Sequence, residues 1–474
     1  MLPAPMPSRS PPSAALPGRP TGRRWTLVVG VVLLLSGATD ASAQLEQDQI
    51  DITGRQNLTL GSGARAYGMG GAFLARPDDA TAASWNPAGL SYLRLPEVSL
   101  VGAYNSYVVE QGVVERDKST GSAFDFAAFT WPIAIKEVRG AVQLSYQRAI
   151  GFDSTREILQ LRGRTDGRSS GGFDVLAVGT GFRLSRRVRA GLTVNRWLNG
   201  YEQELTSQVP DRQNPLREFT IDFRPSGWSA NLGIIFSPVE SLNIGGVFKT
   251  PFTADVELSK RRVDTWSSDT GGTQLTSNQH GSDEVTLDFP ASYGFGLSWR
   301  PWDALTLSAD LTRTRWSRAF IFDYFELKAA PPTIPPSPPS PDFFEELPYP
   351  TLGEDRVVAQ AVDQVDAEQI RVGAEYVLLS RHFKIPIRAG YFNDRQIAAY
   401  PGQSAQRFNG ITVGTGIILG SLLLDVAYLH EFGTYATPVE QQAAPAADSA
   451  EPIPSSLSTN RFFVSVIYRF AGRP

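Results

Sequence analysis

The residues with the clearest capacity for chemistry are two adjacent carboxylates, Asp78 and Asp79, and three histidines, His280, His382 and His430. Neighbouring carboxylates normally point apart, so this pair is better suited to accepting backbone N–H groups at a turn or helix start. The histidines are too widely spaced to predict a metal site or a nucleophile–base pair. The chain has no cysteine, which excludes thiolate metal sites. We therefore expect no enzyme, cofactor or metal; the enzymatic alternative is a serine–histidine lipase that uses His430.

The first 43 residues have the three parts of an export signal. An arginine-containing start that includes Arg23 and Arg24 precedes a short apolar core over 25–35, and a small-residue cleavage site ends at Ala43. The core is shorter than the ~20 apolar residues that a membrane anchor needs. We expect a signal peptide over 1–43, cleaved near Ala43. The net charge of −4 offers no basic surface for nucleic acid.

Apolar and polar residues alternate along almost all of the remaining chain. Near its end, Phe462, Val464 and Val466 are separated by Phe463 and Ser465. Side chains on a strand point to opposite faces in turn, so this pattern predicts strands with one apolar face, in a soluble sandwich or a membrane barrel. Many alternating runs reach ten residues, longer than the usual soluble strand and close to the ~9–11 residues of a membrane strand. Length therefore favours the barrel.

The connections between the predicted strands alternate between short and long. Short turns on one side and long loops on the other are typical of outer-membrane barrels. We predict an all-β fold, a transmembrane antiparallel β-barrel of about 14 strands over 96–474, with a proline-rich loop over 328–365. The predicted strands are 96–109, 122–135, 139–153, 172–183, 188–206, 217–237, 242–263, 282–300, 304–327, 366–379, 383–394, 409–419, 421–435 and 458–470.

Residues 44–95 precede the barrel and do not alternate. They are rich in glycine and alanine and contain three short motifs, Arg65-Ala66-Tyr67, Asp78-Asp79-Ala80 and Asn86-Pro87-Ala88. This stretch resembles the N-terminal hatch of the FadL/TodX family of outer-membrane transporters. Residues 63–73, GARAYGMGGAF, also resemble PorV-like barrels, which work with protein secretion and surface attachment. The resemblance implies a fourteen-stranded barrel with a hatch, or plug, in its lumen.

The resemblance and the residues together suggest roles for individual side chains. A turn at Asn86-Pro87 would fix the path of the hatch, since asparagine bonds its own backbone and proline restricts φ. Lumen-facing arginines could hold a carboxylate head group; the candidates are Arg65, Arg76, Arg371 and Arg388. The expected hatch and gating residues are Asp78, Asp79, Asn86, Pro87 and Ala88. The expected ligand-binding residues are Arg65, Met69, Phe73 and Leu74.

The expected function is passive transport across the outer membrane of a Gram-negative-type cell. The resemblance implies outer-membrane lipids as surroundings and a hydrophobic ligand, such as a long-chain fatty acid. No phosphate-binding loop that could supply energy is present in the sequence. The alternative, from a different class, is a PorV-like barrel that binds a secreted or surface-attached protein.

Overall fold

The structure, a computed structural model, describes ten stretches of the chain. The expected signal peptide, residues 44–60 and nearly all of loop 328–365 lie outside them. Within the described part, no helix is long and apolar enough to cross a membrane. The described residues are 61–111, 115–160, 163–208, 216–267, 274–318, 363–380, 383–395, 398–399, 405–437 and 453–470.

Long strands dominate the secondary structure, and the helical elements are short. The helical elements are α2 (Ala64–Gly68), α3 (Ala82–Trp85), η2 (Pro87–Tyr92) and η3 (Trp316–Arg318). The strands are β1 (Glu97–Gln111), β2 (Glu115–Ile135), β3 (Val138–Gly151), β4 (Ser154–Gln160), β5 (Gly163–Arg183), β6 (Val188–Leu198), β7 (Tyr201–Gln208), β8 (Leu216–Val239), β9 (Leu242–Lys249), β10 (Phe252–Ser267), β11 (Gln274–Phe289), β12 (Ser292–Trp302), β13 (Leu305–Thr314), β14 (Asp363–Gln364), β15 (Ala367–Leu379), β16 (Lys384–Arg395), β17 (Ala398–Ala399), β18 (Arg407–Leu419), β19 (Leu422–Thr437) and β20 (Ile453–Arg469).

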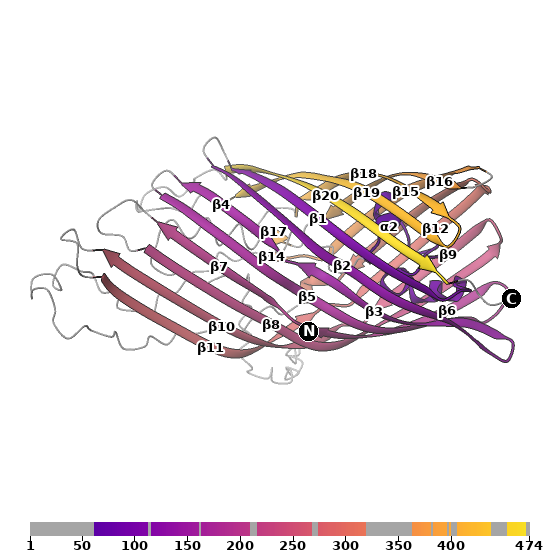
Figure 1. Cartoon of the computed structure of the whole chain (residues 1–474), viewed down its shortest axis with the longest axis horizontal. Coiled ribbons are helices and arrows are strands. Elements are labelled where there is room, and N and C mark those ends of the chain that lie inside the picture. Colours follow the sequence, from indigo (N-terminus) through magenta and orange to yellow (C-terminus); the bar gives the residue numbers. More distant parts are fainter. Residues whose placement is uncertain are drawn as a thin grey trace, which may run out of the picture.

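Strands β14 and β17 pair only with each other; the other strands form one closed antiparallel barrel, in which the chain makes fourteen crossings of the wall (Figure 1). Strand β1 pairs with β2 on one side and with β20 on the other, which joins the two ends of the wall. Four crossings are each divided in two by a break of two residues, as in β3–β4 and β6–β7. The breaks are Phe152-Asp153, Asn199-Gly200, Thr250-Pro251 and Pro290-Ala291. The predicted all-β barrel and its strand number are confirmed.

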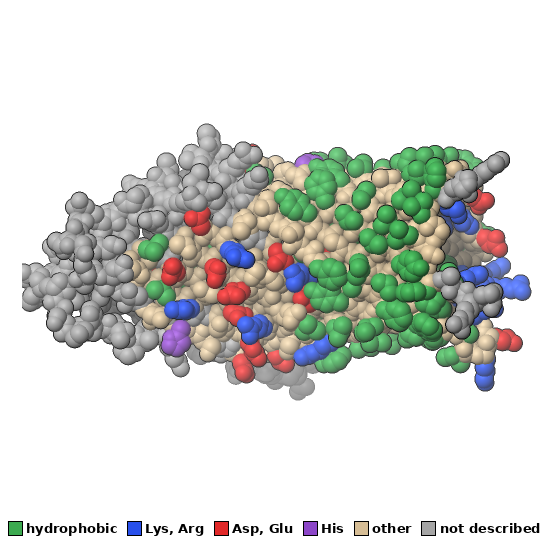
Figure 2. All heavy atoms as spheres, in the orientation of Figure 1, with side chains coloured by type: hydrophobic (Ala, Val, Ile, Leu, Met, Phe, Trp, Pro, Cys, Tyr) green, Lys and Arg blue, Asp and Glu red, His purple; other side chains and the backbone are tan. Residues whose placement is uncertain are grey.

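The outer face of the wall carries an apolar belt. On β20, Phe462 and Val464 are 49% and 53% exposed, whereas Phe463 and Ser465 between and after them are 4% and 2% exposed and face inward. Figure 2 shows hydrophobic side chains over one half of the barrel and charged side chains over the other half. An outward-facing apolar band of this kind is what a barrel wall presents to lipid. The charged half extends the barrel beyond the belt.

Two predicted loops are mostly strand. The predicted loop 154–171 contains β4 and the start of β5, and the predicted loop 264–281 contains the ends of β10 and β11. These hairpins stand beyond the apolar belt, where water meets the outer face. Strands outside the membrane need no alternation of apolar and polar residues, so their sequence pattern predicted a loop. The predicted strand 304–327 was too long, because β13 ends at Thr314 and the 3-10 turn η3 follows it.

A closed barrel predicts a characteristic response to heat. Its inter-strand hydrogen bonds must break together, so the folded form resists detergent until it is heated. We expect the purified protein to run faster on a gel unheated than boiled, with circular dichroism dominated by β structure. Release of the protein from cells by osmotic shock would contradict the membrane barrel.

Candidate functional site

Residues 61–93, here called the inner segment, lie within the barrel and contain α2, α3 and η2. Helices this short are not stable alone, so the surrounding wall must hold them in place. Helix α2 contacts β16, β18, β19 and β20, whereas η2 contacts β3, β5, β6 and β8. The inner segment therefore reaches opposite sides of the lumen.

Glycines on the wall let the backbone of the inner segment approach closely. A Cβ built on Gly233 would lie 2.0 Å from Asn86 Oδ1, and one on Gly191 would lie 2.4 Å from the Pro87 carbonyl oxygen. Real Cβ atoms do not make such contacts, so any side chain here would displace the inner segment or the strand. Similar contacts come from Gly181, Gly245, Gly373 and Gly390. We call these six residues the wall glycines.

Asn86 is fully buried and connects the inner segment to the wall. Its Oδ1 accepts the Ala88 N–H at 3.1 Å, which caps the start of η2. Its Nδ2 donates to the Leu74 carbonyl at 2.9 Å and to the carbonyls of Ile234 and Gly246 at 3.2 and 3.3 Å. Since Ile234 and Gly246 are paired residues of β8 and β9, one side chain holds a turn of the inner segment against a wall ladder. Its gating role stays a prediction.

The two adjacent carboxylates share Arg65, which lies 2.6 Å from Asp78 and 3.7 Å from Asp79, but differ in their other partners. Asp79 Oδ1 accepts the backbone N–H and the hydroxyl of Thr81, at 2.9 and 2.6 Å, just before α3. Asp78 forms ion pairs with Arg65 at 2.6 Å and Arg76 at 3.0 Å. Burial opposes ionisation of Asp78, but these two guanidinium groups hold the pKa of its carboxyl well below the usual range. Burial instead raises the pKa of Asp79. The pair is structural in this arrangement.

Arg65 joins the inner segment to β15. Its guanidinium donates to Glu375 at 3.0 Å as well as to Asp78. Burial alone would lower the pKa of Arg65, but the carboxylates of Asp78 and Glu375 raise it well above its ordinary value. Glu375 is shared with Arg388, which also pairs with Asp425 at 2.6 Å. Arg65, which the sequence analysis expected to bind a ligand, is thus already paired with carboxylates of the protein. Its role in ligand binding stays a prediction.

The other expected ligand residues are packed between the inner segment and the wall. Met69, Phe73 and Leu74 are 2%, 2% and 5% exposed. The backbone N–H groups of Phe73 and Leu74 donate to Asp310 Oδ2 on β13, at 2.6 and 2.8 Å. Nearby, Tyr67 stacks on Phe463 of β20 with ring centroids 4.1 Å apart. Met69, Phe73 and Leu74 are therefore covered by the wall, and movement of the inner segment away from it would expose them.

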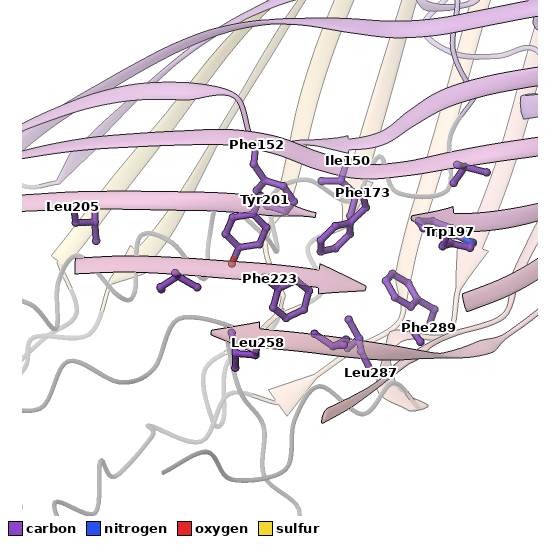
Figure 3. Close-up of a cluster of buried hydrophobic side chains, with 14 of the residues drawn as sticks. Ile150, Phe152, Phe173, Trp197, Tyr201, Leu205, Phe223, Leu258, Leu287 and Phe289 are labelled. Atoms are coloured by element: carbon purple, nitrogen blue, oxygen red, sulfur yellow. The ribbon is translucent and has the colours of Figure 1, made fainter. Parts of the chain in front are cut away.

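A large apolar cluster faces the lumen on one side of the barrel, and sequence reasoning did not find it (Figure 3). Phe252 packs beside it and stacks on Phe289 at 4.6 Å, and Trp197 stacks on Phe252 at 5.0 Å. Four aromatic residues directly flank or occupy strand breaks: Phe152, Tyr201, Phe252 and Phe289. The upper cluster, as we name it, is Ile150, Phe152, Phe173, Val175, Ala177, Trp197, Tyr201, Leu205, Phe219, Ile221, Phe223, Ala254, Val256, Leu258, Leu287 and Phe289.

A small cavity lies between the upper cluster and the inner segment. It has a volume of about 70 Å³ and is lined by Trp197, Phe252, Phe289, Lys249 and Ser84, among others. The Lys249 ammonium donates to the Ser84 carbonyl at 3.4 Å. The cavity thus combines aromatic walls with one cation at the surface of the inner segment.

The wall ladder has a gap beside this region. Pairing of β2 with β3 ends at Phe126↔Gln147, and β2 resumes pairing at Thr120↔Thr155, on β4. Residue Asp125 of β2 is also bypassed in the pairing with β1, as a bulge residue, and it accepts a hydrogen bond from Ser62 of the inner segment. We call this the β2–β3 gap. The sequence shows no proline over 139–153 to mark it.

The remaining candidates have structural partners or lie outside the described residues. Arg371 is 2% exposed and pairs with Asp394 at 2.7 Å, so the expected lumen orientation is confirmed for this arginine. His430 Nδ1 lies 3.0 Å from Asn460 Oδ1, and its ring stacks on Phe432. His382 falls outside the described residues.

The sequence matches no protein-family model and no curated protein. Solved structures do match, over most of both chains. A Pseudomonas aeruginosa FadL homologue shares 12% identity with a TM-score of 0.55, covering 87% of this chain and 99% of that chain. The Pseudomonas putida toluene transporter TodX shares 15% identity with a TM-score of 0.54, covering 88% and 100%.

A third structure, the Ralstonia pickettii toluene transporter TbuX, shares 13% identity with a TM-score of 0.50, covering 87% of this chain and 99% of that chain. All three similarities cover nearly the full length of the other proteins. The chain therefore has a FadL-like fold.

Proposed function

We propose that the protein is an outer-membrane channel that carries hydrophobic small molecules passively, with the inner segment as its hatch. The upper cluster is the observation that carries this proposal. The lumen of a water-filled porin is polar, whereas sixteen buried hydrophobic residues form this one cluster, with the rings of Figure 3 turned toward one another. Apolar surface inside a lumen suits an apolar ligand. The named functions of TodX and TbuX as toluene transporters agree with this class of ligand.

The ligand class that we favour is an amphiphile with an acidic head, such as a long-chain fatty acid. Its tail would lie against Trp197, Phe252 and Phe289, and its carboxylate would meet Lys249. The cavity of about 70 Å³ is smaller than the ~300–1,000 Å³ of typical ligand pockets. Binding a long chain therefore requires the inner segment or the upper cluster to move.

The route out that the structure favours is lateral. The β2–β3 gap lies in a stretch where neighbouring strands are not bonded to each other, so opening it breaks few hydrogen bonds. Ser62 of the inner segment donates a hydrogen bond to Asp125 at this gap. Movement of the inner segment would therefore break that bond and alter the wall at the gap. A route along the barrel axis would instead require the inner segment to break its close backbone contacts with the wall glycines.

The hatch role is tested by deleting residues 44–95. The wall pairs through its own ladders, so the barrel should still fold and show heat-dependent migration. We expect measurable conductance of small ions through the deleted form in planar bilayers and little through the intact protein. High conductance of equal size in both forms would place the closure elsewhere.

The head-group role is tested by replacing Lys249 with glutamine. A hydrogen bond to a charged group contributes about 1.5–3 kcal/mol, so affinity for oleate should fall roughly tenfold or more. Affinity for oleyl alcohol, which has the same chain and no charge, should change little. Lys249→Arg keeps the charge, and Lys136→Gln removes a lysine from an exposed turn; both serve as controls. An unchanged ratio of oleate to alcohol binding in Lys249→Gln would contradict the assignment.

The gating role is tested by replacing Asn86 and Pro87 with alanine. The double variant loses the bonds from Asn86 to Leu74, Ile234 and Gly246, together with the φ restraint of proline. We expect a heat-modifiable barrel whose uptake of labelled oleate is several-fold lower, at matched surface amounts. Asn409→Ala, which alters a wall asparagine bonded to Tyr391 and Asn393, is the matched control.

Unchanged uptake in the Asn86 and Pro87 variant would leave these residues as a structural turn without a gating role. An absence of uptake by every form, the intact protein included, would contradict transport of this ligand. A secreted protein that co-purifies with the intact barrel would then support the PorV-like alternative.

A further inference from the structure

The inner segment contains a tight turn whose backbone lies directly against the wall. Residues 68–74, here called the glycine turn, include Gly70 and Gly71 with φ of 68° and 77°, a left-handed conformation that glycine adopts without strain. A Cβ built on Gly70 would lie 2.9 Å from the Val372 carbonyl oxygen of β15. Side chains of the wall can therefore reach the N–H and C=O groups of the turn.

Two wall residues of opposite charge bond to this backbone. Asp310 Oδ2 on β13 accepts the N–H groups of Phe73 and Leu74, at 2.6 and 2.8 Å. Arg371 Nη1 on β15 donates to the Gly70 carbonyl oxygen at 2.9 Å. Asp310 and Arg371 are 4% and 2% exposed, so both charged groups are buried against the inner segment. We call these two residues the clamp pair.

The two residues of the clamp pair are directly opposite each other in the wall ladder. Asp310 is the register partner of Arg371 in the β13–β15 pairing, and both side chains face the lumen. Cβ atoms at such positions are ~4.5–5.5 Å apart, a span that a carboxylate and a guanidinium can bridge. Within the described structure, however, no ion pair joins them, and Arg371 pairs with Asp394 at 2.7 Å instead.

Each side chain of the clamp pair leans away from the other. The wall order here is β12, β13, β15 and β16. A Cβ built on Gly296 of β12 would lie 2.5 Å from Asp310 Oδ1, so this carboxylate is turned toward β12. Arg371 reaches in the opposite direction, because its partner Asp394 lies on β16. The backbone of the inner segment thus occupies both residues while they stay apart.

Both residues of the clamp pair keep unused hydrogen-bonding capacity. Asp310 Oδ1 and Arg371 Nε are buried and have no hydrogen-bond partner in the described part of the chain. Buried polar atoms are nearly always bonded, so two such atoms on one opposed pair require a physical reason. A second arrangement, in which the two side chains meet, would give both atoms a partner.

We infer that the clamp pair is a two-state switch for the inner segment, an inference that rests on the proposed hatch role. With the hatch in place, Asp310 and Arg371 bond to its backbone; when the hatch moves away, they bond to each other. A buried carboxylate without a partner would strongly oppose release, whereas the opposed guanidinium compensates its charge. The exchange stabilises the released state, so the hatch can open and close again without an energy source.

The test follows opening of the inner segment with no ligand present. The chain contains no cysteine, so Ala72→Cys places a single thiol in the glycine turn, at a residue that is 0% exposed. When reclosing is fast, the rate at which a small thiol reagent labels this position is proportional to the open population. Four forms are compared in this background: no further change, Asp310→Asn, Arg371→Gln with Asp394→Asn, and all three changes together. Replacing Arg371 and Asp394 together leaves no carboxylate without its partner.

We expect the four labelling rates to be non-additive. The rates of the unchanged and triple forms are multiplied and divided by the product of the other two rates. This ratio should be about ten or more, since a hydrogen bond between charged groups forms in the open state alone. A ratio of one, with labelling in every form, would overturn the switch and leave the hatch role intact. An absence of labelling in every form would contradict movement of the inner segment and overturn both.

The matched control is the same cycle for Arg313→Gln and Glu368→Gln. These residues are also opposed in the β13–β15 ladder, but they face outward and already lie 3.6 Å apart. Their ratio should be one. Heat-dependent migration shows that each form is folded. If the amide pair at 371 and 394 does not fold, Arg371→Met with Asp394→Leu replaces it, because an apolar pair is often tolerated in place of a buried ion pair.

Discussion

The structure depends first on satisfying every backbone hydrogen bond of a wall that lies in lipid. Hydrocarbon offers no donors or acceptors, so an open sheet edge cannot remain there. Strand β1 pairs with β20 over its full length, from Glu97↔Arg469 to Gln111↔Ser455. An ion pair between Glu97 and Arg469, at 2.6 Å, lies at one end of this seam. Closure creates an interior, and the chain must then fill it.

Glycine and charge share the task of filling that interior. The wall glycines admit the backbone of the inner segment to contact distance, as Gly233 does for Asn86. Arg65, Glu375 and Arg388 form a buried chain of alternating charges across the same boundary. Removing one partner of such a chain would leave an uncompensated charge, which is strongly destabilising. The inner segment is therefore held by shape at the glycines and by charge at the arginines.

The strand breaks connect the fold to the proposed transport. At Phe152-Asp153 and Asn199-Gly200 the ladder is interrupted, and the flanking aromatic residues meet in the upper cluster. The same break in the β3–β4 crossing leaves the β2–β3 gap. One irregularity thus produces both an apolar surface inside the lumen and a weak line in the wall. Passive movement of a hydrophobic molecule requires these two features together, because it needs a place to dissolve and a way out.

The sequence by itself determined the fold class, the strand number and the side of each strand that faces lipid, because those depend on local alternation, as at Phe462 and Val464. It also located the turn at Asn86-Pro87, whose bond to Ala88 is local. Only the tertiary structure decided what Arg65 contacts, since Glu375 lies 310 residues away along the chain. The upper cluster and the β2–β3 gap were likewise beyond sequence reasoning. They arise where breaks in separate strands meet in space, and neither the register nor the curvature of a closed wall is encoded in any one segment.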